Sequence, residues 1–267
     1  MTSLTLTKHH GLGNDFLVAF DPAVEDLAGL ARRLCDRRTG IGADGLLVAT
    51  HADGYAARMT LYNADGSRAE MSGNGIRCFA QALARRDGSL SEQRILTDAG
   101  DRLVVLTATE SDDTIDARVD MGPVQPLGEP TGWQSLGCHP DRPVAHLSMG
   151  NPHSVVGVDE VAVVDLVELG QQVPEVNLEI IEPGPEANAI TMRVHERGAG
   201  ITAACGTGAC ASAFAARQWG LVAASDPDVI VHMDGGTATV SFAHEAPERA
   251  ILTGPATFIA TLQIEVS

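Results

Sequence analysis

Short strand-like runs of five to seven residues recur along most of the chain, some almost wholly apolar and others with apolar and polar residues in alternation. Both patterns are typical of β-strands. They predict strands at residues 16–20, 46–50, 58–62, 103–107, 115–119, 154–158, 190–195, 229–233, 237–242 and 258–264. An earlier alternating stretch, Leu4, Leu6 and then Lys8, predicts a first strand with Lys8 on its solvent face.

Three segments carry helical signals instead. Residues 24–37 follow Asp21-Pro22, a dipeptide that suits the start of a helix. Residues 74–86 and 207–219 are rich in alanine, and each opens directly after a glycine-rich turn. Strands and a few helices interleave along the whole length, so we expect an α/β (α+β) fold.

The two helix-opening turns belong to an internal repeat. Residues 71–75 (Met-Ser-Gly-Asn-Gly) match residues 204–208 (Ala-Cys-Gly-Thr-Gly) at a constant offset, since 205 − 72 and 208 − 75 are both 133. A second echo relates residues 13–16 to residues 150–153. Such duplication predicts two pseudo-symmetric domains that face each other across a cleft. We expect the domains to span residues 1–118 and 119–255, with the boundary in a stretch where the strand pattern is interrupted.

Composition excludes several classes of function. The chain has 267 residues and a formal net charge of −17, which disfavours nucleic acid and anionic membrane surfaces as partners. No stretch approaches the roughly 18 apolar residues of a membrane span. The N-terminus lacks the basic and apolar regions of a secretory signal. We therefore expect a soluble, cytoplasmic protein.

Residue counts also bear on cofactors. The only lysine is Lys8, and a pyridoxal-phosphate enzyme needs a lysine in its site. The five cysteines are odd in number and form no Cys-x-x-Cys pair, and no His-Glu-x-x-His motif occurs. This pattern suits free thiols in a reducing compartment. We expect neither pyridoxal phosphate nor a metal site.

The repeated turns suggest a chemistry. A Gly-x-Gly turn that opens a helix presents unpaired N–H groups and the positive end of the helix dipole, which together attract a carboxylate. Two converging turns would hold one carboxylate between Ser72 and Cys205. A cysteine at a helix N-terminus has a lowered pKa and can act as a thiolate base. Taken singly, each turn is more often structural, and only their repetition favours a functional interpretation.

The motifs together match a known family over essentially the whole chain. They are His10-Gly-Leu-Gly-Asn-Asp-Phe16, Gly40-Ile-Gly-Ala-Asp-Gly45, Asn63-Ala-Asp-Gly-Ser67, Ser72-Gly-Asn-Gly75, Met149-Gly-Asn-Pro-His153, Val176-Asn177, Glu196-Arg-Gly-Ala-Gly200 and Ala204-Cys-Gly-Thr-Gly208. The chain resembles the diaminopimelate epimerase family. The resemblance implies two domains, each a mixed β-barrel around a central helix, with the active site between them and the C-terminal strand, about 256–267, returning to the first domain.

The resemblance also implies an activity and residue roles. The reaction would be cofactor-independent epimerisation of LL-2,6-diaminopimelate to the meso form, for lysine and peptidoglycan synthesis, by proton transfer at Cα with Cys205 and Ser72 on the two faces. The backbone at Gly73-Asn74 and Gly206-Thr207, with Asn14 nearby, would hold the reacting α-carboxylate. Residues expected to bind the distal end of the substrate are Asn63, Asn151, Asn177 and Arg197. Glu196 would lie beside the reacting α-amino group. A homodimer is left open.

Two positions depart from the family pattern. The family has cysteine where this chain has Ser72, and commonly an acidic residue at Ile201. Cys78 lies six residues into the helix and cannot replace the missing thiol. A serine hydroxyl is a much weaker acid than a thiol, so proton transfer on the Ser72 face is expected to be impaired. The serine could be engineered, natural in a tolerant epimerase, or the mark of a relative with altered chemistry.

Two alternatives to this function remain. One is a related racemase or isomerase acting on a different amino acid, although Arg197 and the asparagines then lose their purpose. The other is a catalytically inactive homologue that binds carboxylates. Ligand binding without exchange of the α-proton would identify the inactive homologue.

Overall fold

The computed structural model describes residues 2–266. The contacts within the chain divide it into two compact units, unit 1 (Met1–Val119 with Gly254–Ser267) and unit 2 (Asp120–Thr253). Two strands, β8 (Thr114–Pro123) and β17 (Ala246–Val266), each run from one unit into the other. Within residues 2–266, no helix has the length and apolarity that crossing a membrane requires.

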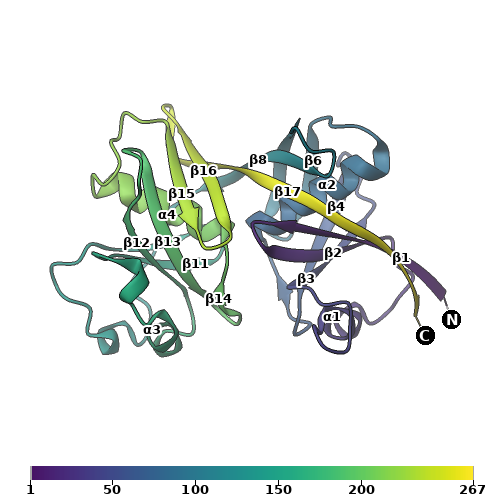
Figure 1. Cartoon of the computed structure of the whole chain (residues 1–267), viewed down its shortest axis with the longest axis horizontal. Coiled ribbons are helices and arrows are strands. Elements are labelled where there is room, and N and C mark those ends of the chain that lie inside the picture. The colour runs from purple at the N-terminus through teal and green to yellow at the C-terminus, as the bar shows by residue number, and fades with distance from the viewer. Residues whose placement is uncertain (1, 267) are drawn as a thin grey trace. The chain divides into compact units, whose positions relative to one another are not determined.

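Unit 1 contains a closed barrel of eight strands within the described part of the chain. Besides β8 and β17 its strands are β1 (Thr2–Gly11), β2 (Asn14–Phe20), β3 (Gly45–Thr50), β4 (Ala57–Asn63), β6 (Gln93–Thr97) and β7 (Gly100–Ala108). Neighbours pair antiparallel except β2 with β3 and β4 with β6, which are parallel. The C-terminal strand β17 lies antiparallel to β1 and so completes the barrel (Figure 1).

Unit 2 repeats this order of pairings. Its strands are β9 (Gln125–Pro126), β10 (Val144–Ser148), β11 (Pro152–Gly157), β12 (Asn177–Pro183), β13 (Ala189–Glu196), β15 (Asp228–Met233) and β16 (Gly236–Ala243). Two pairs are again parallel. β11 with β12 corresponds to β2 with β3 of unit 1, and β13 with β15 corresponds to β4 with β6. Short strands β5 (Arg68–Ala69) and β14 (Gly200–Thr202) flank β4 and β13 in the same way. Topology thus confirms the duplication that the repeated turns predict.

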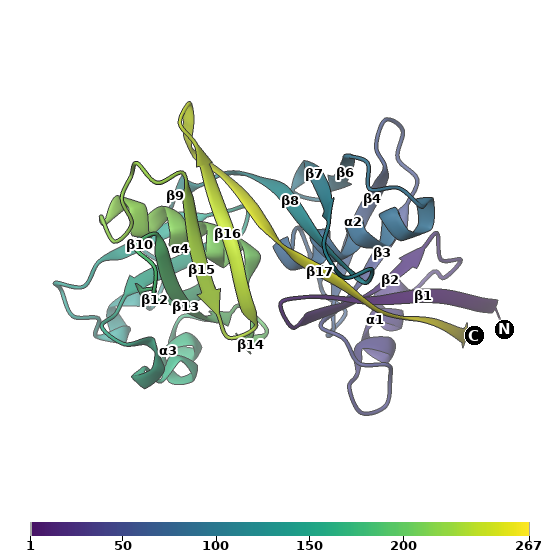
Figure 2. The same cartoon turned by 45° about the horizontal axis from the view of Figure 1, so that its top comes forward.

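Each barrel encloses one helix. The helices are α2 (Gly73–Asp87) in unit 1 and α4 (Gly206–Gln218) in unit 2. Every residue of α2 from Gly73 to Ala84 is buried, and so is every residue of α4 from Gly206 to Ala213. Burial around the full circumference requires packing on all sides, which a surrounding barrel supplies. Figures 1 and 2 show each helix among the strands of its own unit. The expected barrel around a central helix is therefore confirmed.

The shorter helices lie outside the barrels. Helix α1 (Leu27–Cys35) packs Leu30 and Leu34 against Leu4 and Leu6 of β1. Helix α3 (Leu166–Gln172) and the 3-10 turns η1 (Trp133–Leu136) and η2 (Val161–Val163) cover a second cluster in unit 2.

The predicted start of the first helix is wrong. Asp21 has a φ of 42° and is not helical. The helix begins at Leu27 because the Asp26 side chain accepts a hydrogen bond from the Gly29 backbone N–H at 2.7 Å.

Two further predictions, the exposure of Lys8 and the length of the last strand, differ from the structure for reasons that lie in the tertiary fold. Lys8 does not lie on a solvent face, because the β1 face that carries Leu4 and Leu6 turns toward the core under α1. Its side chain is only 18% exposed, with Nζ 2.9 Å from Asp15 and 2.6 Å from the Gly42 carbonyl. The last strand is far longer than residues 258–264, because β17 has 21 residues and continues through both units.

Candidate active site

The first repeated turn lies at the N-terminus of α2. Ser72 is the N-cap residue, with φ −139° and ψ 124°, and its Oγ accepts a hydrogen bond from the Gly75 N–H at 3.0 Å. A Cβ on Gly75 would lie 3.0 Å from the Ser72 Cβ, so a larger residue at this position would force Ser72 to shift. The N–H groups of the first helical turn have no acceptor within the helix, which leaves the turn suited to an anion.

Asn14 is positioned beside this turn by the tight β1–β2 connection, in which Leu12 has a φ of 55°. The Asn74 side chain donates to Asn14 Oδ1 at 3.2 Å, and Asn14 Nδ2 donates to Asp44 at 2.6 Å. Fully buried Arg77 donates to Asn74 Oδ1 at 2.8 Å and to the Gly73 carbonyl at 3.1 Å. The structure thus brings Ser72, Gly73, Asn74 and Asn14 together, a group that we call the Ser72 half-site.

Asn63 closes β4 and is exposed, and its Nδ2 donates to Ser67 Oγ at 3.0 Å. Because Asn63 is exposed, its amide is accessible to a ligand.

The second repeated turn lies at the N-terminus of α4. Cys205 is the N-cap residue, with φ −128° and ψ 113°, and its Sγ accepts from the Gly208 N–H at 3.4 Å. The thiol lies 3.3 Å from Glu196 Oε2, to which it donates. The other oxygen of Glu196 accepts from the Thr202 hydroxyl. Two strands, β13 and β14, therefore hold a carboxylate directly against the thiol.

This arrangement overturns the predicted acidity of Cys205. Burial raises the pKa of the Cys205 thiol well above its ordinary value, and the Glu196 and Glu179 carboxylates raise it further. Cys205 is only 4% exposed, and this desolvation outweighs the hydrogen bonds from Thr207 and Gly208, which lower the pKa. The raised pKa favours the thiol form of Cys205, and Glu196 is the group placed to accept its proton.

A hydrogen-bond chain continues from Cys205 into the barrel. Cys205 Sγ lies 3.5 Å from Thr207 Oγ1, and Asn151 Nδ2 donates to that same hydroxyl at 3.4 Å. Asn151 Oδ1 lies 3.0 Å from His153 Nε2, and His153 Nδ1 lies 2.6 Å from Glu179 Oε1. We call Cys205, Gly206, Thr207, Asn151 and Glu196 the Cys205 half-site.

Sequence reasoning missed two members of this chain. His153 stands in the Met149–His153 motif and could have been singled out there. Glu179 lies in β12, a strand that the hydrophobic pattern did not predict, between apolar neighbours that hide it. An isolated carboxylate within an apolar run is itself a signal, because such a group needs a buried partner.

Asn177 is the first residue of β12, and Arg197 directly follows the last residue of β13. Buried Asn177 donates to the Pro152 carbonyl at 3.0 Å and accepts from the Arg197 backbone N–H at 2.9 Å. The Arg197 side chain is exposed, and its guanidinium has no carboxylate partner among residues 2–266. Ile201, in β14, exposes 38% of its surface.

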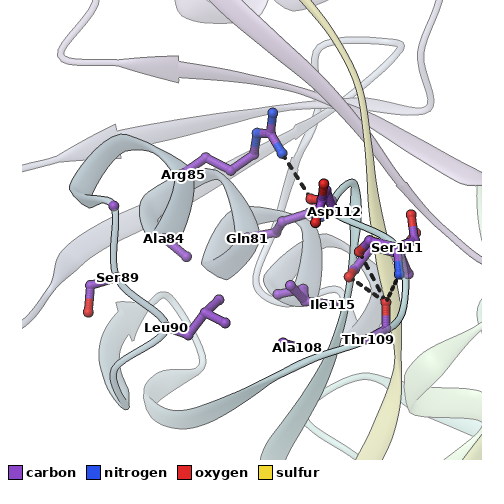
Figure 3. A pocket seen from close by; sticks show the side chains of 12 residues that line it. Gln81, Ala84, Arg85, Ser89, Leu90, Ala108, Thr109, Ser111, Asp112 and Ile115 are labelled. Carbon is purple, nitrogen blue, oxygen red and sulfur yellow. Dashed lines mark hydrogen bonds between the residues drawn. The ribbon is translucent and has the colours of Figure 1, made fainter.

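Neither turn carries a metal cluster in the described part of the chain. Within residues 2–266, no group of three or more histidine, cysteine or acidic side chains could hold a metal ion. A pocket of about 240 Å³ lies instead at the other end of α2, lined by Gln81 and Arg85 among others (Figure 3). Gln81 is nine residues beyond Ser72, roughly 13 Å along the helix. No predicted site residue lines this pocket.

The family model of diaminopimelate epimerase matches residues 6–127 and 145–259. A diaminopimelate epimerase from Synechococcus elongatus is 37% identical over 292 residues, which cover 99% of each chain.

Two solved structures share the fold. A phenazine biosynthesis protein of the PhzF family from Bacillus anthracis superposes with a TM-score of 0.77 at 14% identity, covering 100% of both chains. A hydroxyproline epimerase from Agrobacterium vitis, with bound trans-4-hydroxy-L-proline, superposes with a TM-score of 0.68 at 16% identity, covering 99% of this chain and 91% of the other.

Proposed function

The chain belongs to the diaminopimelate epimerase family and is an amino-acid epimerase, and from this premise we propose that it interconverts LL- and meso-2,6-diaminopimelate without a cofactor. The observation that carries the proposal is the pair of capped helix N-termini, Ser72 on α2 and Cys205 on α4, with Glu196 bonded to the thiol. Residues 1–118 with 256–267, and residues 119–255, are the two proposed epimerase domains, and each contributes one half-site.

In the proposed reaction, the substrate α-carboxylate binds the first-turn N–H groups at both turns. These N–H groups and helix dipoles stabilise the charge that reaches the carboxylate when Cα loses its proton. Glu196 takes the thiol proton and Cys205, now a thiolate, removes the α-proton from its face. The Ser72 hydroxyl gives a proton to the opposite face, which completes the inversion. Ser72 then regains a proton from water and Glu196 releases its proton to water, so both return to their starting states.

The roles of the outer residues follow from charge and exposure. Arg197 presents an unpaired guanidinium, which suits a bidentate contact with the distal carboxylate. Asn63, Asn151 and Asn177 contribute amides that bind the distal amino-acid group. Asn14 and Asn74 lie beside the α-carboxylate, with the charge of buried Arg77 behind them.

Ser72 limits this reaction. A thiol has a reference pKa of about 8.5, and a hydroxyl ionises far less readily, so the serine is a poor acid–base group without a partner. Ser72 Oγ accepts the capping hydrogen bond from the Gly75 N–H, a group that can donate a proton but cannot take one from the serine. We therefore propose that interconversion is slow by about 10²–10⁴-fold relative to a chain with cysteine here.

The test is proton NMR of LL- and, separately, meso-diaminopimelate in D₂O with this protein and with Ser72→Cys. We expect slow loss of the α-proton signal with the chain as it stands and a rate about 10²–10⁴-fold higher with the variant. Absence of exchange of either isomer by both proteins would remove diaminopimelate as the substrate. Equal rates for the two proteins would show that Ser72 is a fully competent group and that the proposed impairment is wrong.

A further inference from the structure

The proposed reaction leaves one buried pair unused. The side chains of His153 on β11 and Glu179 on β12 are both 0% exposed, with Nδ1 and Oε1 2.6 Å apart. A Cβ on Gly208 would lie 2.6 Å from Glu179 Oε1, so the backbone of α4 passes directly over the carboxyl group. The second oxygen of Glu179 has no hydrogen-bond partner among residues 2–266. Such a group costs stability, so its presence calls for a compensating role.

The contact fixes where the protons of this pair lie. Burial raises the pKa of Glu179 above its ordinary value. The pair is net neutral either as a carboxylic acid beside a neutral ring or as a carboxylate beside a doubly protonated ring, and both arrangements leave a proton on His153 Nε2. A carboxylate beside a ring protonated only on Nδ1 would bury a net negative charge. The neutral pair therefore makes His153 Nε2 a donor.

That donor sets the direction of every later hydrogen bond. His153 Nε2–H donates to Asn151 Oδ1 at 3.0 Å, which turns the amide nitrogen toward Thr207 Oγ1 at 3.4 Å. Because the Thr207 oxygen accepts from Asn151, its own proton is left for the Cys205 sulfur at 3.5 Å. A donor aimed at sulfur favours the thiolate over the thiol.

Unit 1 shows that the fold does not require this polar pair. The β11–β12 register joins His153 to Asn177, and the β2–β3 register joins Phe16 to Gly45. Two residues farther along the third strand stand Glu179 in unit 2 and Leu47 in unit 1. A Cβ on Gly75 would meet Leu47 at 3.5 Å, as one on Gly208 meets Glu179. The same place under the helix is thus filled by apolar side chains in one barrel.

We propose that Glu179 is a positioning residue. Through His153 it fixes the direction of the hydrogen-bond chain, so that the last donor of the chain points at the Cys205 sulfur. Without a donor at position 179, the ring can place its proton on Nδ1, the Asn151 amide can turn over, and the Thr207 hydroxyl then accepts from the thiol. The role rests on the proposed function in that Cys205 is the group that moves the α-proton.

Two variants of equal length separate this role from simple packing. Glu179→Gln keeps an N–H that can donate to His153, whereas Glu179→Met has no donor. Leu47→Met introduces the same side chain at the counterpart position of unit 1 as a control. Thermal unfolding of each variant reports whether it folds.

The first readout is the pH profile of α-proton exchange in D₂O. The titratable groups that face Cys205 are Glu196 and Glu179, and those that face Glu179 are His153, Glu196 and Cys205. We expect the Met variant to lower kcat by about 10- to 100-fold with little change in KM, the scale for losing a hydrogen bond to a charged group. The Gln variant and Leu47→Met should stay within about threefold of the parent.

The second readout needs no substrate. The rate of Cys205 alkylation by iodoacetamide, resolved by peptide mass spectrometry, is followed against pH with half-exposed Cys138 as internal reference. We expect the Glu179→Met curve to move to higher pH and the Glu179→Gln curve to remain in place. Coincident Gln and Met curves would overturn the positioning role. If the curves differ while no diaminopimelate isomer exchanges, the proposed function fails and the positioning role stands.

Discussion

The Ser72 and Cys205 half-sites share a backbone and differ in what surrounds it. Both caps have extended dihedral angles, and the side chain of each accepts a hydrogen bond from the backbone N–H three residues later, that of Gly75 or Gly208. Around Ser72 lie apolar Leu47 and the buried cation Arg77, whereas around Cys205 lie two carboxyl groups, Glu179 and Glu196.

This difference separates two tasks that the duplicated turn could have performed equally. A cation beneath the α2 turn adds to the helix dipole and strengthens its attraction for a carboxylate. Carboxyl groups around the α4 turn oppose an anion but supply a proton acceptor beside the thiol. The backbone thus presents the same capped helix N-terminus twice, and the packed side chains place carboxyl groups beside only one of the caps, Cys205.

The largest effect is expected when the two caps are made identical. Cys205→Ser should leave the cap in place, because a hydroxyl also accepts from Gly208. It removes the group that Glu196 can deprotonate, so α-proton exchange should fall by about 10²–10⁴-fold. Exchange followed by NMR in D₂O measures the loss, and an unchanged rate would show that Cys205 is not the base.

A second prediction removes the charge of Arg197, which precedes the turn of unit 2 and has alanine as its counterpart in unit 1. Arg197→Ala places at this position the residue that unit 1 has at Ala64, 133 positions earlier. Binding of diaminopimelate should weaken by about 2–5 kcal/mol, the scale for removing one partner of a desolvated charge pair. Calorimetric titration tests this, with exposed Arg38→Ala as the matched control, and equal affinities would exclude a contact with Arg197.

The third prediction uses His9, a buried histidine of unit 1. His9 Nδ1 lies 2.8 Å from Gln81 Oε1, and burial lowers the pKa of His9 to about 4. His9 therefore binds a proton near pH 6.5 in the unfolded chain but only near pH 4 in the folded chain. Stability should fall as pH drops through this window, by about 3 kcal/mol from this group.

Urea unfolding at pH 7 and pH 4.5 measures that loss. His9→Gln should reduce the difference between the two pH values, while exposed His51→Gln should leave it unchanged. Equal pH dependence of His9→Gln and the parent would contradict the assignment.

The smallest effect concerns the two glycines under the caps. A Cβ at residue 208 would lie 2.6 Å from Glu179 Oε1 and 3.3 Å from the Cys205 sulfur, whereas one at residue 75 meets Ser72 at 3.0 Å. Both alanine variants should destabilise the chain by about 1–3 kcal/mol, since overpacking forces neighbours to move. Gly208→Ala should also slow α-proton exchange more than Gly75→Ala does. The opposite order would indicate that the Glu179 carboxyl group beside Gly208 does not affect exchange.

Local patterns predicted much of the framework. Short strand-like runs predicted most strands of both units, and the repeat of residues 71–75 at residues 204–208 anticipated two equivalent helices with equivalent caps. β12 was missed because residues 177–181 are all buried, so the polar side of the alternation is lost. β6 was missed because its sequence, Gln-Arg-Ile-Leu-Thr, does not alternate although its burial does. The helix start at Asp26 was missed because Asp21-Pro22 offers an equally good local signal.

Residues close together in the chain are enough to specify the duplicated turn, its caps Ser72 and Cys205, and the family. The chemistry open to those caps depends instead on the packing of distant strands. The tertiary structure buried Lys8 against Asp15, placed Glu179 beneath Gly208, and raised the pKa of Cys205 where a helix N-terminus alone would lower it. Desolvation and the proximity of charges depend on strands that are distant in sequence, so a local motif cannot specify them.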